Sequence, residues 1–312
     1  MRNVRSFRDL RAPAAAALAM ACIACSTLAV ATPFVFDTGD PNGLMATASR
    51  PSSAGRIEIE SADDFLINTQ TSLTSATFTG LLTGGVTTSS IGEVRVEIYR
   101  VFPADSDVNR TSGAPTFSTP EVPKRVNSPS DVEFVDRDTV SSNLSFSTSV
   151  LSNSFSVLNT VQSGINPRPN QTTGGDGPVS GQEVRFSVTF LTPIDLAPDH
   201  YFFVPQVQIT SANGQFLWLS GVRPLGGSGT TPFLPDLQSW IRTDNLAPDW
   251  LRIGTDIVGP SPTGAPAPTF NGSFSLNGQS VDAVPEPGTL FLLASGMMIG
   301  AWRRRAVRRT RH

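Results

Sequence analysis

Strict alternation of apolar and polar side chains is the feature that most constrains how this chain can fold. Val94, Val96 and Ile98 are separated by polar residues at positions 93, 95, 97 and 99, and residues 183–190 repeat the pattern. Successive side chains of a β-strand point to opposite faces, so such a segment buries one set and exposes the other. We therefore expect antiparallel strands packed through their apolar faces, with the polar set in water.

Comparable apolar segments recur along the chain, separated by stretches rich in Gly, Pro, Ser and Asn. The further predicted strands are residues 56–60, 65–67, 75–82, 144–150, 155–161, 201–209, 215–219, 250–253 and 270–276. Helix-forming residues do not recur at helical spacing in this part of the chain. The pattern favours an all-β domain, a two-sheet antiparallel β-sandwich of jelly-roll type.

We place this β-sandwich domain at residues 32–276, followed by a spacer at residues 277–284. Two long segments dense in Pro, Gly, Asn and Ser interrupt it, at residues 103–131 and 164–181. Neither has strand periodicity, and loops of this length are often functional in a compact domain.

The N-terminal residues 1–31 have the three parts of a secretory signal peptide. Arginines at positions 2, 5, 8 and 11 precede an apolar segment that closes on Ala29-Val30-Ala31. Small residues at Ala29 and Ala31 are what signal peptidase requires, so we expect a signal helix that is cleaved after Ala31 to leave Thr32 first. A retained N-terminal anchor is the alternative.

The C-terminal residues 285–312 also resemble a targeting segment. Pro285, Glu286 and Pro287 precede an apolar run at 288–302, and Arg303, Arg304 and Arg305 follow it directly. The prolines prevent a helix from continuing upstream, and the arginines hold the end of the run on the cytoplasmic side of a membrane. We expect a short transmembrane helix over 288–302 with an arginine stop.

This order of Pro-Glu-Pro, apolar run and arginine cluster is similar to the PEP-CTERM sorting signal of exported bacterial proteins. Gly288 and Thr289 continue the match, which covers about the last tenth of the chain. The resemblance implies an exosortase-type membrane peptidase as a partner, together with signal peptidase during export. It also implies a transient inner-membrane anchor and delivery to the cell surface, outer membrane or extracellular matrix of a Gram-negative-type bacterium that makes exopolysaccharide.

The charge of the exported body differs from that of the whole chain. Removing both targeting segments leaves 13 of the 23 basic residues and 24 of the 26 acidic residues, a net charge near −11. Such a body repels phosphate backbones, so we expect no nucleic-acid partner. Both cysteines lie in the signal segment and His200 is the one histidine of the body. These counts disfavour nucleophile-base catalysis and zinc sites, and we expect no catalytic residues and no cofactor apart from structural calcium.

Carboxylates are the remaining source of catalysis. Glu58 and Glu60 share one face of a predicted strand, and Asp63 and Asp64 follow. Hydrolysis of glycosides needs only two carboxyl groups at a suitable separation. Solvated strand residues explain the same pattern, so the prediction is a protein that is not an enzyme, with a glycoside-acting enzyme as the alternative.

A calcium site is a candidate in the first long loop. Asp105, Asp107 and Asn109 offer alternating oxygen ligands for structural Ca²⁺. Arg110 stands where an EF-hand needs glycine, and Thr116 stands where it needs glutamate, so this is no EF-hand. Asp136 and Asp138 form a second candidate pair, and an ordinary acidic turn is the alternative for both.

Tryptophans are the candidate carbohydrate contacts. Trp240 lies in a turn-rich segment and Trp250 begins a predicted strand, so an exposed pair could stack on sugar rings. Trp218 lies in an apolar strand, where we expect it to be buried. The sequence as a whole predicts an exported structural or adhesive protein of the cell surface or exopolysaccharide matrix. The alternative is a carbohydrate-binding or carbohydrate-active module.

Overall fold

The computed structural model describes residues 31–53, 55–110, 125–165, 172–222 and 237–281. Nearly all of them belong to one compact unit, Thr32–Ser280. The two predicted terminal helices lie outside the described residues. So do Ala29, the sorting residues 285–287 and the arginine stop at 303–305. Among the described residues, no helix has both the length and the apolar character needed to cross a membrane.

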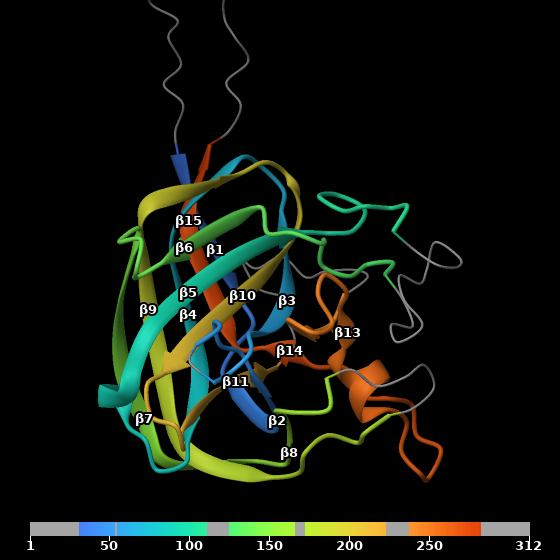
Figure 1. Cartoon of the computed structure of the whole chain (residues 1–312). Helices are drawn as coiled ribbons and strands as arrows, with labels where there is room; N and C mark the ends of the chain where they lie inside the picture. Colours follow the sequence, from blue (N-terminus) through green and yellow to red (C-terminus); the bar gives the residue numbers. More distant parts are fainter. Residues whose placement is uncertain (1–30, 54, 111–124, 166–171, 223–236, 282–312) are drawn as a thin grey trace, which may run out of the picture. The chain divides into compact units, whose positions relative to one another are not determined.

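Two sheets make up the described part of the chain, and their strands lie across one another (Figure 1). The six-stranded sheet has the order β13-β12-β3-β10-β5-β6. Its strands are β3 (Ile59–Ile67), β5 (Ile91–Arg100), β6 (Val135–Asp138), β10 (Asp199–Ile209), β12 (Trp240–Thr243) and β13 (Leu251–Arg252). All the pairings described for it are antiparallel.

The second, nine-stranded sheet has the order β1-β15-β4-β11-β2-β8, with β7 and β9 branching from β4, and β14 from β11. Its strands are β1 (Ala31–Asp37), β2 (Pro41–Ala48), β4 (Thr71–Thr83), β7 (Leu144–Val157), β8 (Asn159–Val161), β9 (Val179–Leu196), β11 (Gln215–Gly221), β14 (Asn271–Gly272) and β15 (Phe274–Val281). The β2–β8 pairing is parallel, so this sheet is mixed. Two short helical turns complete the fold, η1 (Thr88–Ser90) and η2 (Ile253–Val258).

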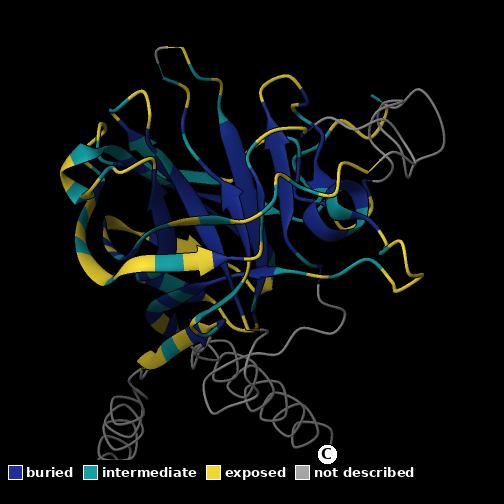
Figure 2. Ribbon diagram, turned by 90° about the horizontal axis from the view of Figure 1, so that it is seen from below, coloured by how far each residue is buried: buried dark blue, intermediate teal, exposed yellow. Residues whose placement is uncertain are grey.

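The main core lies between the sheets and is built from phenylalanines. Phe78 and Phe186 stack with ring centroids 4.9 Å apart, and Phe203 from the six-stranded sheet stacks on Phe274 at 4.8 Å. Trp218 is buried among them, as its strand predicts. Figure 2 shows buried residues concentrated in the central strands. The alternating apolar residues therefore do face one core, which confirms a β fold of two sheets; the jelly-roll connection stays a prediction.

A second cluster packs β2, β8 and β11 against β12, β13 and η2. Its members include Met45, Leu217, Leu219, Ile241, Leu251 and Ile257, all buried. Leu81 of β4 and Val157 of β7 also belong to this cluster. Away from it, the outward-facing side chains of β15, β4, β9 and β7 are mostly polar.

Several predicted boundaries were wrong. Strand β15 runs to Val281, well into the predicted spacer at 277–284, because a polar segment can pair through its backbone without showing apolar alternation. Strand β7 runs through the strand predicted at 144–150 and into the one predicted at 155–161, with register shifts between them, and the last residues of the second form the separate strand β8. The loop predicted at 164–181 ends earlier, since β9 begins at Val179. Within the described parts of 103–131 no strand forms, as predicted.

Candidate functional site

A buried ionic network lies on the outer face of the six-stranded sheet. Arg242 on β12 pairs with Glu60 on β3 through both its Nε and Nη2 atoms, the latter 2.9 Å from Oε1. The same Nη2 lies 2.8 Å from the hydroxyl of Tyr99, which in turn donates to Glu60 Oε1 at 2.6 Å. The strand register places these groups together, because Arg242 faces Glu60 directly.

Glu97 adds a second carboxyl group to this network. Its Oε2 lies 3.1 Å from the Tyr99 hydroxyl, and its Oε1 lies 3.5 Å from Arg95. Burial raises the pKa of Glu97 well above its usual range, and the charge of Glu60 raises it further. Binding of a proton by Glu97 therefore relieves the cost of a buried charge and its repulsion from Glu60. Sequence alternation placed Glu97 and Tyr99 in water, which was wrong: both are buried.

Trp250 and Trp240 pack against this network and are not exposed to solvent. Each is only 1% exposed. The Trp250 ring lies 4.3 Å from the Arg242 guanidinium carbon, and its indole N–H donates to the Ser130 carbonyl at 3.1 Å. The Trp240 indole donates to Leu237 O at 2.8 Å. The prediction that these tryptophans are exposed was wrong, because both pack into the buried network, where Trp250 stacks on the Arg242 guanidinium.

The network has little of what glycoside hydrolysis requires. Hydrolases hold two carboxyl groups roughly 5–10 Å apart, with the scissile bond between them. Here Glu60 and Glu97 meet at one hydroxyl group, and both are buried. Glu58 extends the network outward, where it accepts a hydrogen bond from Gln206 at 2.9 Å and lies 3.8 Å from Arg95.

The other two acidic candidates are held separately. Asp63 Oδ1 accepts a hydrogen bond from the Ser239 hydroxyl at 3.0 Å. Asp64 Oδ2 lies 2.7 Å from His200 Nε2. The four predicted carboxylates thus do not converge on one centre.

The acidic loop that was predicted to hold calcium is held by arginine side chains and by a backbone hydrogen bond. Asp105 forms a two-point ion pair with Arg100, and Asp107 Oδ1 accepts the backbone N–H of Asn109 at 2.9 Å. Arg125 then ties the loop to Asp131 at 2.6 Å. Asp138 caps a turn through Ser141 N at 2.6 Å, and Asp136 lies opposite Glu97 across β6 and β5. Across the described ranges, no cluster of three or more His, Cys, Asp or Glu side chains is placed to hold a metal. Calcium binding here stays a prediction.

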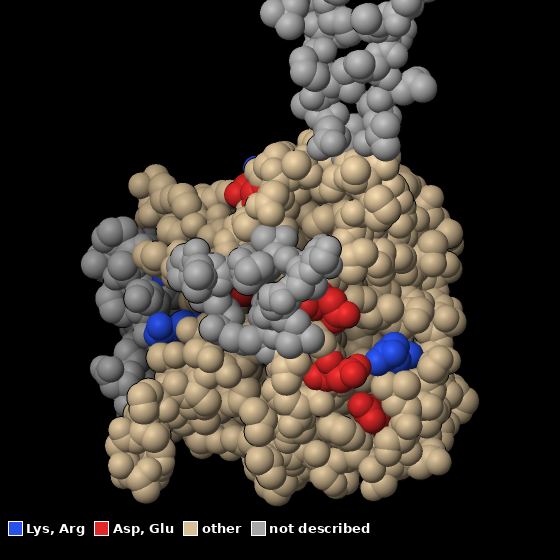
Figure 3. Space-filling model, turned by 180° about the vertical axis from the view of Figure 1, so that it is seen from behind, with Lys and Arg blue, Asp and Glu red and all other residues tan. Residues whose placement is uncertain are grey.

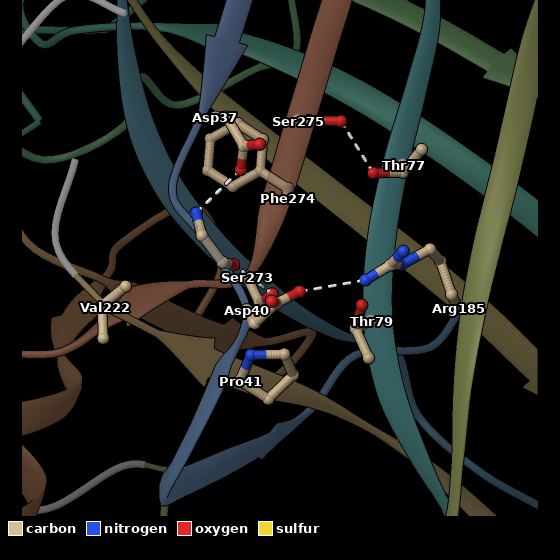
Figure 4. A pocket seen from close by; sticks show the side chains of 11 residues that line it. Asp37, Asp40, Pro41, Thr77, Thr79, Arg185, Val222, Ser273, Phe274 and Ser275 are labelled. Carbon is tan, nitrogen blue, oxygen red and sulfur yellow. Dashed lines mark hydrogen bonds and ion pairs between the residues drawn. The ribbon is translucent and has the colours of Figure 1, made fainter. Parts of the chain in front are cut away.

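An open groove of about 630 Å³, with both polar and apolar walls, lies on the nine-stranded sheet. Figure 4 shows its side chains, which come from β1, β2, β4, β9, β15 and neighbouring connections. The groove is lined by Asp37, Gly39, Asp40, Pro41, Thr77, Thr79, Arg185, Val222, Ser273, Phe274 and Ser275. It therefore presents carboxylates, one guanidinium and several hydroxyls together with the apolar side chains of Pro41, Val222 and Phe274.

Two contacts organise the groove. Arg185 Nη2 pairs with Asp40 Oδ1 at 3.0 Å, and both side chains are well exposed, at 41% and 87%. The Thr77 and Ser275 hydroxyls lie 2.7 Å apart. Figure 3, from the side opposite to Figure 1, shows acidic side chains gathered beside a basic one, within a surface that otherwise has few charges. Such a groove can bind a polar, uncharged ligand without first breaking a buried structure.

The sequence alone did not predict the groove, nor that Arg242, Tyr99 and Glu97 form a buried network with Glu60. The groove residues come from strands far apart in sequence, and β1 and β2 were not predicted because Pro33, Pro41 and Gly43 obscure them. Arg242 could have been suspected, because it directly follows the apolar residues Trp240 and Ile241. Its partner Glu60 could not be identified without the register.

Comparison with known proteins identifies the tail. Residues 283–305 match the family model of the PEP-CTERM protein-sorting motif. The chain thus carries this motif, as its Pro-Glu-Pro residues indicate, and the match does not extend to the β domain. No curated protein and no solved structure was found to match the chain.

Proposed function

We propose that this chain is an exported protein, held at the cell surface or in the extracellular polysaccharide matrix, where its β domain has a structural or adhesive role without catalysis. The observation that carries the proposal is the sorting motif at 283–305, which makes exosortase the expected processing partner. The compact unit begins at Thr32, the residue that cleavage after Ala31 would leave first. This unit ends at Ser280, before the matched residues 283–305.

The geometry of the β domain supports a non-catalytic role. Its buried carboxyl pair is capped by tryptophan, while its open groove holds an exposed ion pair and hydroxyls. A role as carbohydrate-binding module is the second candidate, and the groove is the feature that favours it over an enzyme.

Fractionation of cells that express tagged variants tests the sorting step. Glu286→Ala removes the central residue of the motif, so the protein should accumulate in the inner membrane instead of reaching the surface. Asp282→Ala is the matched control, because this acidic residue lies just outside the matched range. N-terminal sequencing of the exported protein should begin with Thr32-Pro33. Normal surface delivery of the Glu286→Ala protein would refute the proposed route.

A further inference from the structure

Two rows of small polar side chains cross four strands beside the groove. In the first row Ser275, Thr77, Ser187 and Ser147 face one another across β15, β4, β9 and β7. In the second row Asn277, Ser75, Thr189 and Ser145 do the same. These eight residues, seven with hydroxyl groups and Asn277 with an amide, are called here the hydroxyl face. They alternate with core residues such as Phe78 and Phe186, so they point away from the core.

The hydroxyl face is accessible and continuous with the groove. Its members on β7 and β9 are exposed, and those on β4 and β15 are half-buried. Thr77 and Ser275 belong to both features. The rows therefore extend the groove across the sheet and end at β7, which pairs only with β9 among the described strands.

The chemistry of this face selects its occupant. A hydroxyl group both donates and accepts hydrogen bonds, so a row of hydroxyls matches a ligand that is itself rich in hydroxyls. Stable protein interfaces instead centre on aromatic side chains, Met and Arg, and are depleted in Ser. An anionic polymer is disfavoured because the body is strongly acidic and Arg185 is paired with Asp40.

The spacing of the strands further restricts which hydroxyl-rich ligand fits the hydroxyl face. Neighbouring strands lie about 4.8 Å apart, which is close to the advance of one sugar unit along an extended polysaccharide. We propose that the hydroxyl face binds an extended, uncharged polysaccharide that crosses the strands with about one sugar unit per strand, and that the groove holds its end. This inference rests on the proposed extracellular, adhesive role and names its ligand.

Titration calorimetry with the protein recovered after export tests this inference. The probes are cellotetraose and cellohexaose, which are extended and uncharged. Maltohexaose has the same sugar units in a curved chain, and hexagalacturonate has similar length but negative charge. We expect both cello-oligosaccharides to bind with similar affinity, since four strands match about four units. Maltohexaose and hexagalacturonate should bind at least tenfold more weakly.

A matched pair of variants locates the site. Thr77→Val with Ser187→Ala removes two hydroxyls from the first row and should weaken cellohexaose binding at least tenfold. Thr87→Val with Ser89→Ala removes an exposed hydroxyl pair, 2.9 Å apart, from a turn outside the rows and should leave binding unchanged.

Four results would overturn the inference. The first is that neither cello-oligosaccharide binds. The second and third are that maltohexaose binds as tightly as cellohexaose, or that hexagalacturonate binds more tightly than cellohexaose. The fourth is that the two double variants lose cellohexaose affinity equally. A dimer in sedimentation that Ser187→Arg dissociates would assign the face to a second copy of the chain instead. In any of these cases, surface delivery that still depends on Glu286 would show that the sorting proposal stands and only the ligand assignment fails.

Discussion

The two sheets share one phenylalanine core, but their outer faces differ in chemistry. Outside the six-stranded sheet, Arg242, Glu60 and Glu97 are buried beneath Trp250. Outside β15, β4, β9 and β7, the side chains are small, polar and mostly uncharged, with one solvent-exposed ion pair at the groove. Burial makes charges expensive unless they are paired, whereas exposed hydroxyls cost almost nothing to keep.

This difference assigns stability to the outer face of the six-stranded sheet and ligand recognition to the hydroxyl face of the nine-stranded sheet. A buried ion pair that also makes several hydrogen bonds fixes how β3, β5 and β12 are arranged, but it gives a ligand nothing to reach. The hydroxyl face contributes little to folding and leaves its polar groups within reach of a ligand. We therefore expect substitutions on the two faces to differ in kind, and the predictions below are ordered by their expected effect on stability.

The largest expected effect is that of Arg242→Met. It removes the cation that is paired with Glu60 and leaves the buried charge of that carboxyl group uncompensated, so the free energy of unfolding should fall by about 3–5 kcal/mol. Arg185→Met is the matched control on the other sheet, where its exposed ion pair should contribute less than about 1 kcal/mol. Urea unfolding measures both. Equal losses would contradict the division between the two faces.

A smaller loss is expected for Tyr99→Phe. The substitution keeps the ring beneath Trp250 but deletes the hydroxyl that joins Glu60, Glu97 and Arg242. Leaving these buried groups with an unmade hydrogen bond should cost about 1–3 kcal/mol. Thermal unfolding followed by circular dichroism is a suitable measurement, and a Tm equal to that of the unmodified protein would mean that the hydroxyl is not part of the network.

These two variants also mark the limit of what the sequence could predict. Alternation at residues 93–99 correctly identified a strand and its core side, since Val94, Val96 and Ile98 are buried. The opposite side was predicted to be solvated because periodicity distinguishes two faces without saying what covers each. Residues around Trp240 and Trp250, about 150 positions later, bury Tyr99, and such long-range contacts leave no local pattern.

The tail shows the opposite case. Pro285, Glu286 and Pro287 are contiguous, so their order alone identifies the sorting motif. The groove could not be found in this way, because Asp40, Thr77, Arg185 and Ser275 meet only through strand pairing. Four strands, β1, β2, β6 and β12, were also missed, since short or proline-containing segments offer few alternating positions.

The pH dependence of stability should report the buried carboxyl pair. Burial and the Glu60 charge raise the pKa of Glu97 in the folded state, so the folded protein binds its proton more tightly than the unfolded chain does. The resulting stabilisation is complete below the unfolded pKa of about 4.3 and is lost as pH rises through the folded value. Burial also raises the pKa of Glu58 and of Asp136, so these groups change the stability in the same direction.

Glu97→Gln isolates the contribution of this group, because the amide remains neutral at every pH while Glu60, Arg95, Tyr99 and Arg242 continue to face it. Relative to the parent, the variant should gain up to about 1.4 kcal/mol of stability per pH unit across the titration of Glu97. Urea unfolding at a series of pH values measures the difference. A constant difference between the two proteins would mean that Glu97 does not hold the proton.

The smallest effect on stability is expected for Thr77→Val with Ser187→Ala on the hydroxyl face. Ser187 is exposed and Thr77 is half-buried beside Ser275, so each change should alter the free energy of unfolding by less than about 0.5 kcal/mol. The same double variant is expected to lose cellohexaose binding. A protein of unchanged stability that no longer binds would show that these hydroxyls serve recognition, whereas a loss comparable to that of Arg242→Met would place them with the buried network as structural groups.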